Sequence, residues 1–387
     1  MAYDFDEPVR RLGSASYKWD AANDPGVLPM WVADMDFKTA PCVIEALEKR
    51  ARHGVFGYTK IPDAYFDATA AWFKKRHAFG IKREWILPTT GVLPAIAAVI
   101  RALTKPGDKI ILQTPAYNCF FPLIKNGGCE ALSSGLIYEN GAYSMDFDDF
   151  EAKASDPAAR LFLLCSPHNP AGRVWKEWEL ERIGETAVRH GLTVVSDEIH
   201  CDLTFKGNRH MPFASLGKDF LENSVTCTSP SKTFNIAGLQ AANVIAADPQ
   251  TRRKIADAME ANEVSGLSPF AVDALVAAYN GGGEWLDELR DYLYGNYEFM
   301  LRYLGDNLPR LRVLPLEATY LAWVDCSALG IPSAQIAKTL FDREKLWINA
   351  GTMYGPEGEG FIRINLACPR KLLKKGLDKI KSAFAGA

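Results

Sequence analysis

Short apolar runs alternate with helical stretches from Ile86 to about Ala247. Five of these runs predict strands, at residues 108–113, 160–166, 192–197, 224–229 and 243–248. Strands that are apolar along their whole length are typical of a mostly parallel sheet that helices bury on both faces. The pattern therefore predicts an α/β wound domain in the middle of the chain.

The N-terminal part has a different pattern. Residues 1–39 lack helical periodicity and are rich in Asp and Trp, which favours an irregular arm. A helix is predicted from Pro41, a favoured residue of the first turn, to a stop at Gly54. A second, amphipathic helix is predicted from about Asp63 to His77.

Helices dominate again after the central alternation, notably from Gly283 to about Leu304. The last quarter mixes predicted strands at 319–325, 345–349 and 361–367 with helices at about 333–343 and 370–385. This pattern predicts a smaller α+β domain, which could also recruit the N-terminal arm. The predicted division is residues 1–45 as the arm or part of the small domain, 46–270 as the large domain and 271–387 as the small domain.

Length and composition narrow the class of protein. A chain of 387 residues is long enough for more than one compact unit, and 48% hydrophobic with 24% charged residues is typical of a soluble globular protein. The formal net charge of −3 argues against nucleic-acid binding. An acidic N-terminus and the lack of an apolar run of about 18–20 residues predict a cytoplasmic protein without a membrane segment.

Cysteine and histidine spacings give no sign of a metal site. The eight cysteines contain no CxxC pair and predict reduced, mostly structural thiols. The six histidines form no HxxxH or HExxH pattern, so no protein-bound metal is expected.

Lys232 lies in the stretch SPSKTFNIAG (residues 229–238), directly after a predicted strand. The pattern indicates a strand that ends in a turn presenting one amine, and Ser229 and Ser231 add hydroxyl groups that could hold a phosphate. An amine that captures an aldehyde must be partly desolvated, so that its neutral form is populated near neutral pH. Lys232 is our candidate for the residue that carries a cofactor, although most lysines are solvated surface charges.

Two loops nearer the N-terminus offer contacts for a flat, phosphorylated ligand. Gly91 lies at a strand-to-helix turn, where free backbone N–H groups and the helix dipole favour an anion, although an ordinary cap has the same pattern. Tyr117 lies in the loop after the strand at 108–113, where its ring could either stack on a flat cofactor or pack into the core.

Polar side chains follow two further strands. Asn169, in SPHNPAGRVW, could donate to a ring oxygen or simply form a turn. Asp197, in VVSDEIHCDL, could hold a pyridine nitrogen protonated or cap the next turn. Arg363, in FIRINLACPR, suits bidentate capture of a carboxylate, with a structural ion pair as the alternative.

The order of the motifs MWVADMDF, GYT, SPHNPAGRVW, SDEIH and SPSKTFNIAGLQ is more specific than any one of them. It resembles the fold-type I pyridoxal-phosphate (PLP) enzymes of the aspartate-aminotransferase superfamily over nearly the whole chain. Within that superfamily the motifs are similar to those of the MalY/PatB group of cystathionine β-lyases, or carbon–sulfur lyases. The resemblance implies an α/β fold with a mostly parallel seven-stranded sheet between helices, a smaller α+β domain, and PLP as the cofactor.

The resemblance also implies roles for individual residues. Lys232, Asp197 and Tyr117 would be the catalytic residues. Lys232 would bond to the cofactor, Asp197 would pair with the ring nitrogen and Tyr117 would stack on the ring. Arg363 would bind the substrate carboxylate. The remaining implied cofactor contacts are Asn169 at the ring oxygen, Gly91, Val92, Ser229 and Ser231 at the phosphate, His200 beside the ring, and Tyr58 reaching the phosphate of a neighbouring subunit in a homodimer.

Departures from the transaminase pattern favour the lyase group. His200 stands where many transaminases have a tyrosine, and Gln240 stands where they have an arginine. The implied reaction is α,β-elimination, which converts L-cystathionine and related cysteine S-conjugates into a thiol (homocysteine), pyruvate and ammonia. A PLP-dependent class I/II aminotransferase remains an alternative, as does a regulatory protein that uses the fold as an interaction module.

Overall fold

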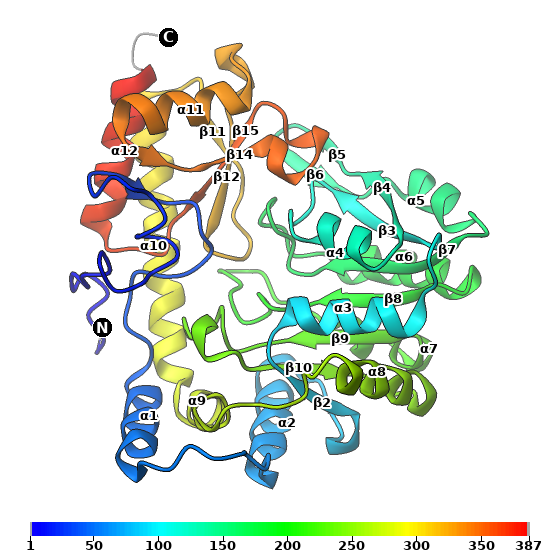
Figure 1. The fold of residues 1–387 in the computed structure, drawn as a ribbon. Helices are drawn as coiled ribbons and strands as arrows, with labels where there is room; N and C mark the ends of the chain where they lie inside the picture. Colours follow the sequence, from blue (N-terminus) through cyan, green and yellow to red (C-terminus); the bar gives the residue numbers. More distant parts are fainter. Residues whose placement is uncertain (1, 385–387) are drawn as a thin grey trace.

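A seven-stranded sheet forms the centre of the larger part of the molecule (Figure 1). The computed structural model describes residues 2–384. Within this sheet β10 runs antiparallel to both of its neighbours, whereas the pairs from β9 to β4 are parallel. In spatial order the strands are β2 (Ile86–Thr89), β10 (Ala242–Ile245), β9 (Ser224–Thr228), β8 (Thr193–Asp197), β7 (Ala159–Cys165), β3 (Lys109–Thr114) and β4 (Glu130–Gly135).

Helices bury both faces of this sheet because its central strands are apolar on both sides. In β7, Leu161 and Leu163 pack into one hydrophobic cluster, while Phe162 and Leu164 pack into another on the opposite face. The first face is covered by α3 (Val92–Leu103), α4 (Phe120–Asn126) and α8 (Pro249–Ala261), and the second by α5 (Phe147–Ala154), α6 (Glu177–Arg189) and α7 (Lys218–Glu222).

A third hydrophobic cluster joins the remaining helices to the small domain. The helix α9 (Pro269–Gly281) packs on α1 (Pro41–His53) and α2 (Asp63–His77), and the long α10 (Gly283–Asn307) runs from there toward the C-terminal elements (Figure 1). The small domain contains α11 (Ser333–Glu344), α12 (Arg370–Phe384) and an antiparallel sheet of β11 (Arg312–Val313), β12 (Leu321–Asp325), β15 (Phe361–Asn365) and β14 (Asn349–Ala350).

The N-terminal arm is held by charge as well as by packing. Its strand β1 (Leu28–Pro29) pairs in parallel with β13 (Leu346–Trp347) of the small domain. Within the arm, Arg11 pairs with Asp34 at 2.6 Å and with Asp36 at 2.7 Å, and the buried Lys18 pairs with Asp36 at 2.8 Å. The two Asp residues of MWVADMDF therefore stabilise the arm through ion pairs between its own residues.

Most predicted elements match the structure closely. All five predicted strands of the central alternation are present, and so are the helices predicted from Pro41 and Asp63. The helix predicted over 370–385 ends at Phe384 among the described residues, and residue 385 lies outside them. The predicted division near residue 270 falls at the start of α9, and the domain limits stay a prediction.

Three differences have local causes. The edge strands β2 and β4 complete the sheet but were not among the predicted apolar runs, because Pro88 interrupts β2 and β4 reads EALSSG. The segment predicted as one strand at 345–349 is divided, because β13 pairs with β1 while β14 pairs with β15. A short hairpin, β5 (Ile137–Glu139) with β6 (Ala142–Ser144), was not predicted.

The expected lack of a membrane segment and the expected free cysteines can both be compared with the structure of residues 2–384. No helix in this range is long and apolar enough to cross a membrane. All eight cysteines lie in the same range, and each is free.

Candidate active site

The carboxyl ends of the parallel strands converge on a cavity of about 270 Å³. Polar ligands of open α/β sheets bind at this edge, because loops from several strands meet there. The structure brings together around this cavity nearly all of the predicted site residues: Gly91, Val92, Tyr117, Asn169, Asp197, His200, Ser229, Ser231 and Lys232. Arg363 contacts the set from the side, and Tyr58 lies apart.

Lys232 lies in the turn after β9 and points into the cavity region beneath the N-terminal arm. Its Nζ donates a hydrogen bond to the backbone oxygen of Ala33 at 2.6 Å. Burial lowers the pKa of Lys232 to about 8, with the nearby Asp34 opposing this shift and Arg363 adding to it. A useful fraction of the amine is therefore neutral and nucleophilic close to neutral pH.

Asp197 ends β8 and is buried, with 4% of its surface exposed. The backbone N–H of Ile199 donates to its Oδ1 at 3.1 Å. Burial raises the pKa of Asp197 to about 7, because this single backbone hydrogen bond and the more distant Lys232 only partly offset the loss of water. A cation at this carboxylate would complete the site, and a protonated ring nitrogen is such a cation.

Asn169 and Arg363 form a pair at the side of the cavity. Arg363, buried in the middle of β15, donates from Nη1 to Oδ1 of Asn169 at 3.1 Å and from Nη2 to the backbone oxygen of Trp31 at 2.8 Å. Its guanidinium lies over the ring of Tyr354, 4.8 Å from the centroid. Because Asn169 uses its oxygen for Arg363, its amide N–H groups remain for a ligand oxygen.

Neutral donors surround the other end of the cavity. Gly91 is the residue before α3, and no acidic side chain lies in the first turn of that helix. The first N–H groups of a helix lack intrahelical acceptors, so the backbone at Gly91 and Val92 presents donors to an anion. Ser229 donates its hydroxyl proton to the backbone oxygen of Ala241 at 2.6 Å, which leaves Ser231 as the freer hydroxyl donor.

The two side chains with predicted ring contacts are uncharged. Burial, reinforced by Cys119, raises the pKa of Tyr117, so its hydroxyl keeps its proton. Burial, together with Lys232 and Arg363, lowers the pKa of His200 to about 3, so its imidazole is neutral. Among residues 2–384, Nδ1 of His200 has no hydrogen-bond partner.

Tyr58, unlike the buried Arg363, lies on the surface as well as outside the lining of the cavity. It lies between α1 and α2 with its side chain fully exposed, beside the exposed Val55 and Phe56. Phe56 stacks on Phe270 at a centroid distance of 5.4 Å. A contact of Tyr58 with a phosphate within the same chain is therefore excluded by its position.

Sequence reasoning missed the contribution of the arm to the site. The Ala33 oxygen accepts from Lys232 and also from the hydroxyl of Tyr320 at 2.9 Å. The role of a backbone oxygen cannot be predicted from residue type. Tyr320 lies next to an apolar run, where an aromatic residue is normally predicted to belong to the hydrophobic core. The motif MWVADMDF was the available clue, since it is unusually polar and aromatic for a core segment.

These residues fit the phosphorylated aldehyde cofactor expected from the sequence. Within residues 2–384, Asp197 has no cationic partner in contact and the amide N–H groups of Asn169 have no acceptor, while the start of α3 presents N–H groups to the same cavity. An amine that can form a covalent bond, a carboxylate that can face a ring nitrogen and an anion site around one cavity correspond to the parts of such a molecule.

Comparisons with known proteins agree with this geometry. The family model for aminotransferase class I and II matches residues 26–380. The cystathionine beta-lyase PatB of Bacillus subtilis (strain 168) is 43% identical over 98% of this chain and 100% of its own length. The protein MalY of Escherichia coli (strain K12) is 35% identical over 99% of both chains. The crystal structure of cystalysin from Treponema denticola, which contains pyridoxal 5'-phosphate, superposes with a TM-score of 0.96 at 34% identity over 99% of both chains.

Proposed function

The chain belongs to the aminotransferase class I and II family, and from this premise we propose that it is a PLP-dependent carbon–sulfur β-lyase. Its substrates would be L-cystathionine and related cysteine S-conjugates. The observation that carries the proposal is that Lys232 and the buried Asp197 line one cavity, with the buried Arg363 bonded to Asn169 of the same lining. The chain is also similar throughout its length to a named cystathionine beta-lyase.

The cofactor would be held by groups that the structure already orients. Lys232 would bond to it, Asp197 would face its ring nitrogen and Tyr117 would cover its ring. When bound, PLP withdraws electrons from the substrate α-carbon, so that a proton can leave that carbon. The other contacts would be Asn169 and His200 beside the ring and Gly91, Val92, Ser229 and Ser231 at the phosphate.

Arg363 would orient the substrate through its α-carboxylate. Its guanidinium is fixed by Asn169, by the Trp31 oxygen and by the Tyr354 ring, so little side-chain entropy is lost when a carboxylate binds. The amine of Lys232 would take the α-proton, because burial keeps part of it neutral. The β-thiol then leaves, and water completes the conversion of L-cystathionine into homocysteine, pyruvate and ammonia.

The test is to supply L-cystathionine alone to the purified holoenzyme and to measure pyruvate and free thiol. The lyase predicts both products in equal amounts without any added keto acid. Lys232→Ala should abolish turnover, with the Cys326→Ala variant, which lacks a buried thiol in the small domain, as a control that keeps it. Full activity of Lys232→Ala would end the proposal.

An aminotransferase is the second candidate, because the family model that matches carries that description and transamination needs the same lysine, aspartate and arginine. The same assay distinguishes the two reactions. A transaminase would release no pyruvate from L-cystathionine alone and would convert its cofactor to the amine form, with turnover only after a keto acid is added.

We further propose a homodimer in which Tyr58 crosses to the partner's cavity. Its support is the exposed apolar stretch around Val55, Phe56 and Tyr58, which water would otherwise surround. Coexpression of Tyr58→Phe and Lys232→Ala chains tests this, since a mixed dimer would carry one site with neither change. Activity of the mixture above that of either variant alone is expected, and a monomer in light scattering would contradict the dimer.

The cytoplasmic location expected from the sequence also belongs to this proposal. Eight free cysteines within residues 2–384 are typical of a protein from a reducing compartment.

A further inference from the structure

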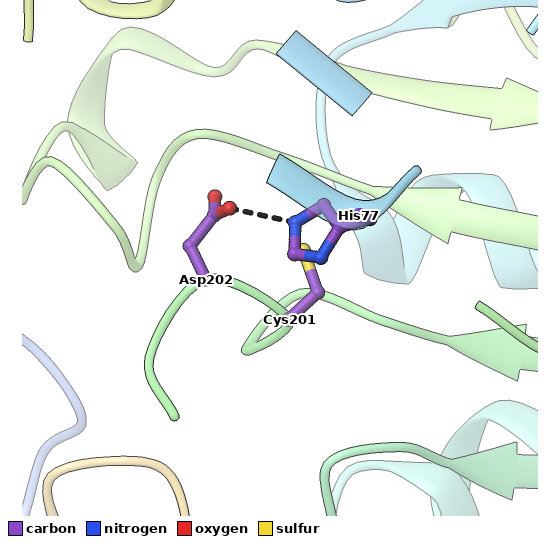
Figure 2. Close-up of side chains that lie close together, drawn as sticks. All are labelled: His77, Cys201 and Asp202. Atoms are coloured by element: carbon purple, nitrogen blue, oxygen red, sulfur yellow. Dashed lines mark hydrogen bonds and ion pairs between the residues drawn. The ribbon is translucent and has the colours of Figure 1, made fainter. Parts of the chain in front are cut away.

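A second buried polar cluster lies beside the active site but takes no part in the proposed chemistry. It consists of His77, the last residue of α2, and of Cys201 and Asp202 in the turn after β8. One ligand atom from each residue lies within 4.8 Å of the other two, and all three side chains are buried. Figure 2 shows them converging, with the sulfur of Cys201 beside the imidazole of His77.

We propose that His77, Cys201 and Asp202 bind one Zn²⁺ ion per chain. Imidazole nitrogen, thiolate sulfur and carboxylate oxygen are the donors that zinc takes in proteins, and three protein ligands with water in the fourth position form a complete tetrahedral shell. A cavity of about 200 Å³ is lined by the same three residues and leaves room for that water.

The present distances require only small movements. Tetrahedral zinc with bonds of about 2.0–2.3 Å places ligand atoms roughly 3.3–3.8 Å apart, so the 4.8 Å group contracts slightly. The hydrogen bond of 2.8 Å between Nε2 of His77 and Oδ1 of Asp202 opens by a few tenths of an ångström. The proton of His77 moves to Nδ1, and the thiol proton of Cys201 is released to solvent.

Asp202 is already oriented by groups outside the ligand set. The indole N–H of Trp72 donates to it at 3.0 Å, and the hydroxyl of Thr233 donates to its Oδ2 at 2.9 Å. Such partners hold a ligating carboxylate in one orientation and are typical of zinc sites.

Charge balance suits a buried zinc ion here. Zn²⁺ with one thiolate, one carboxylate and a neutral imidazole has no net charge, so its burial carries a small desolvation cost. The two arginines of α2 and α10 that line the cavity are engaged elsewhere: Arg76 pairs with Asp287 at 2.7 Å, and Nε of Arg290 donates to the Thr204 oxygen at 2.7 Å.

The ion would join α2 to the loop that leads from β8. The histidine and aspartate are separated by 125 residues, which is why no local spacing in the sequence indicated a metal. Thr233, which bonds to Asp202, follows Lys232 directly, so the ion would brace the turn that carries the catalytic lysine without contacting the cofactor.

The test uses reduced holoenzyme, treated with a chelator, equilibrated with ZnCl₂ and passed through a desalting column before metal analysis. One zinc per chain is expected in the unaltered protein and in Cys326→Ala, which removes a buried thiol far from the cluster. Cys201→Ala and His77→Ala should each retain at least tenfold less zinc. His190→Ala is the matched control for His77, since His190 also pairs with a carboxylate, Glu151, at 2.6 Å.

Replacement by Co²⁺ provides a second readout that does not depend on activity. Tetrahedral coordination with a thiolate predicts visible d–d bands at wavelengths beyond the cofactor absorbance, which Cys201→Ala should lose. Unaltered holoenzyme that retains less than a tenth of an equivalent of zinc would overturn the proposal. Equal retention by Cys201→Ala would overturn it too, because the ion would then be bound elsewhere. Neither outcome depends on which reaction the active site catalyses.

Discussion

Asp197, the last residue of β8, and Asp202, in the turn that follows it, are two carboxylates with opposite surroundings. Both are buried, with 4% and 5% of their surfaces exposed. Burial by itself raises the pKa of each, yet hydrogen bonds from His77, Thr233 and Trp72 more than offset it at Asp202 and lower the pKa there. From the described part of the chain the Asp197 carboxylate receives one hydrogen bond, from a backbone N–H, and its pKa is raised to about 7.

In the metal-free chain, this difference separates a carboxylate whose hydrogen bonds are supplied by the fold from one whose hydrogen bonds are largely missing. Asp202 is satisfied by its own chain, so the fold gains from it. No residue among 2–384 supplies a positive charge in contact with Asp197, so the burial of this carboxylate destabilises the fold unless a cationic ligand binds there. Arg363 and His200 share this incompleteness, because within residues 2–384 Nε of Arg363 and Nδ1 of His200 lack partners.

The largest effect is expected when Asp197 is replaced by Asn. Without a carboxylate at the ring nitrogen, turnover should fall about a hundred- to a thousand-fold, measured as kcat with L-cystathionine. Replacement of Glu317, a carboxylate that pairs with Arg173 and does not line the cavity, by Gln serves as control and should leave kcat within a few-fold. An Asp197→Asn enzyme with unaltered kcat would remove Asp197 from the mechanism.

The Asp197→Asn variant should be more stable than the unaltered protein when both lack the cofactor. The pKa of Asp197 is about 7 in the folded protein and has an ordinary value of 3.8. The folded state therefore binds the proton more tightly than the unfolded state, and the free energy of unfolding falls as the pH rises from about 4 to 7. At pH 8 apo Asp197→Asn should therefore be more stable than the unaltered apoprotein by about 1–4 kcal/mol, measured by urea unfolding. This advantage should vanish near pH 4, and a gain that is independent of pH would contradict the argument.

Asp202→Asn should do the reverse. It leaves the donors of His77, Trp72 and Thr233 with a weaker acceptor and should lower the free energy of unfolding by about 3–5 kcal/mol in metal-free protein, with or without cofactor. Urea unfolding of apo and holo forms measures this loss. A loss below about 0.5 kcal/mol, the usual range of a surface substitution, would contradict the claim that Asp202 stabilises the fold.

A smaller effect is expected at Arg363. Lysine keeps the positive charge but cannot bridge the substrate carboxylate, Asn169 and the Trp31 oxygen together, so Arg363→Lys should cost about 2 kcal/mol, or roughly thirty-fold in kcat/KM, mostly through KM. Steady-state kinetics checks this, and Arg310→Lys on the surface of the small domain is the control. A change confined to kcat would point to a role other than carboxylate binding.

Tyr320→Phe should have the smallest effect. The rate should rise with pH as Lys232, with a pKa of about 8, loses its proton. Removing the Tyr320 hydroxyl leaves the Ala33 oxygen to Lys232 alone, which stabilises the ammonium form and should move this rise to higher pH by less than about one unit. The pH profile of kcat measures the shift, and a move to lower pH would contradict the shared-oxygen arrangement.

Much of the fold was predictable because its signals are local. Five apolar runs marked central strands, and Pro41, Gly54 and the periodicity after Asp63 marked helices. Polar residues at strand ends indicated Asn169, Asp197 and Lys232, and the parallel arrangement places them at one edge of the sheet. The roles of these residues remain proposals, but their assembly around one cavity was foreseen from their positions in the chain.

Other features depend on which segments meet in space, and no local pattern encodes that. Arg363 reaches Asn169 only because the small domain packs against the large one, and Ala33 reaches Lys232 only because the arm folds back over the cavity. Asp197 and Asp202 have opposite pKa shifts because α2 and the turn that carries Lys232 supply side-chain donors to Asp202, whereas no side chain among residues 2–384 donates to Asp197. The sequence by itself determined the elements and the chemical groups, since these follow from local propensity and side-chain identity. The tertiary structure alone decided which polar groups have hydrogen-bond partners within the fold and which remain available to a ligand. Solvation and hydrogen bonding depend on neighbours that are distant in the chain.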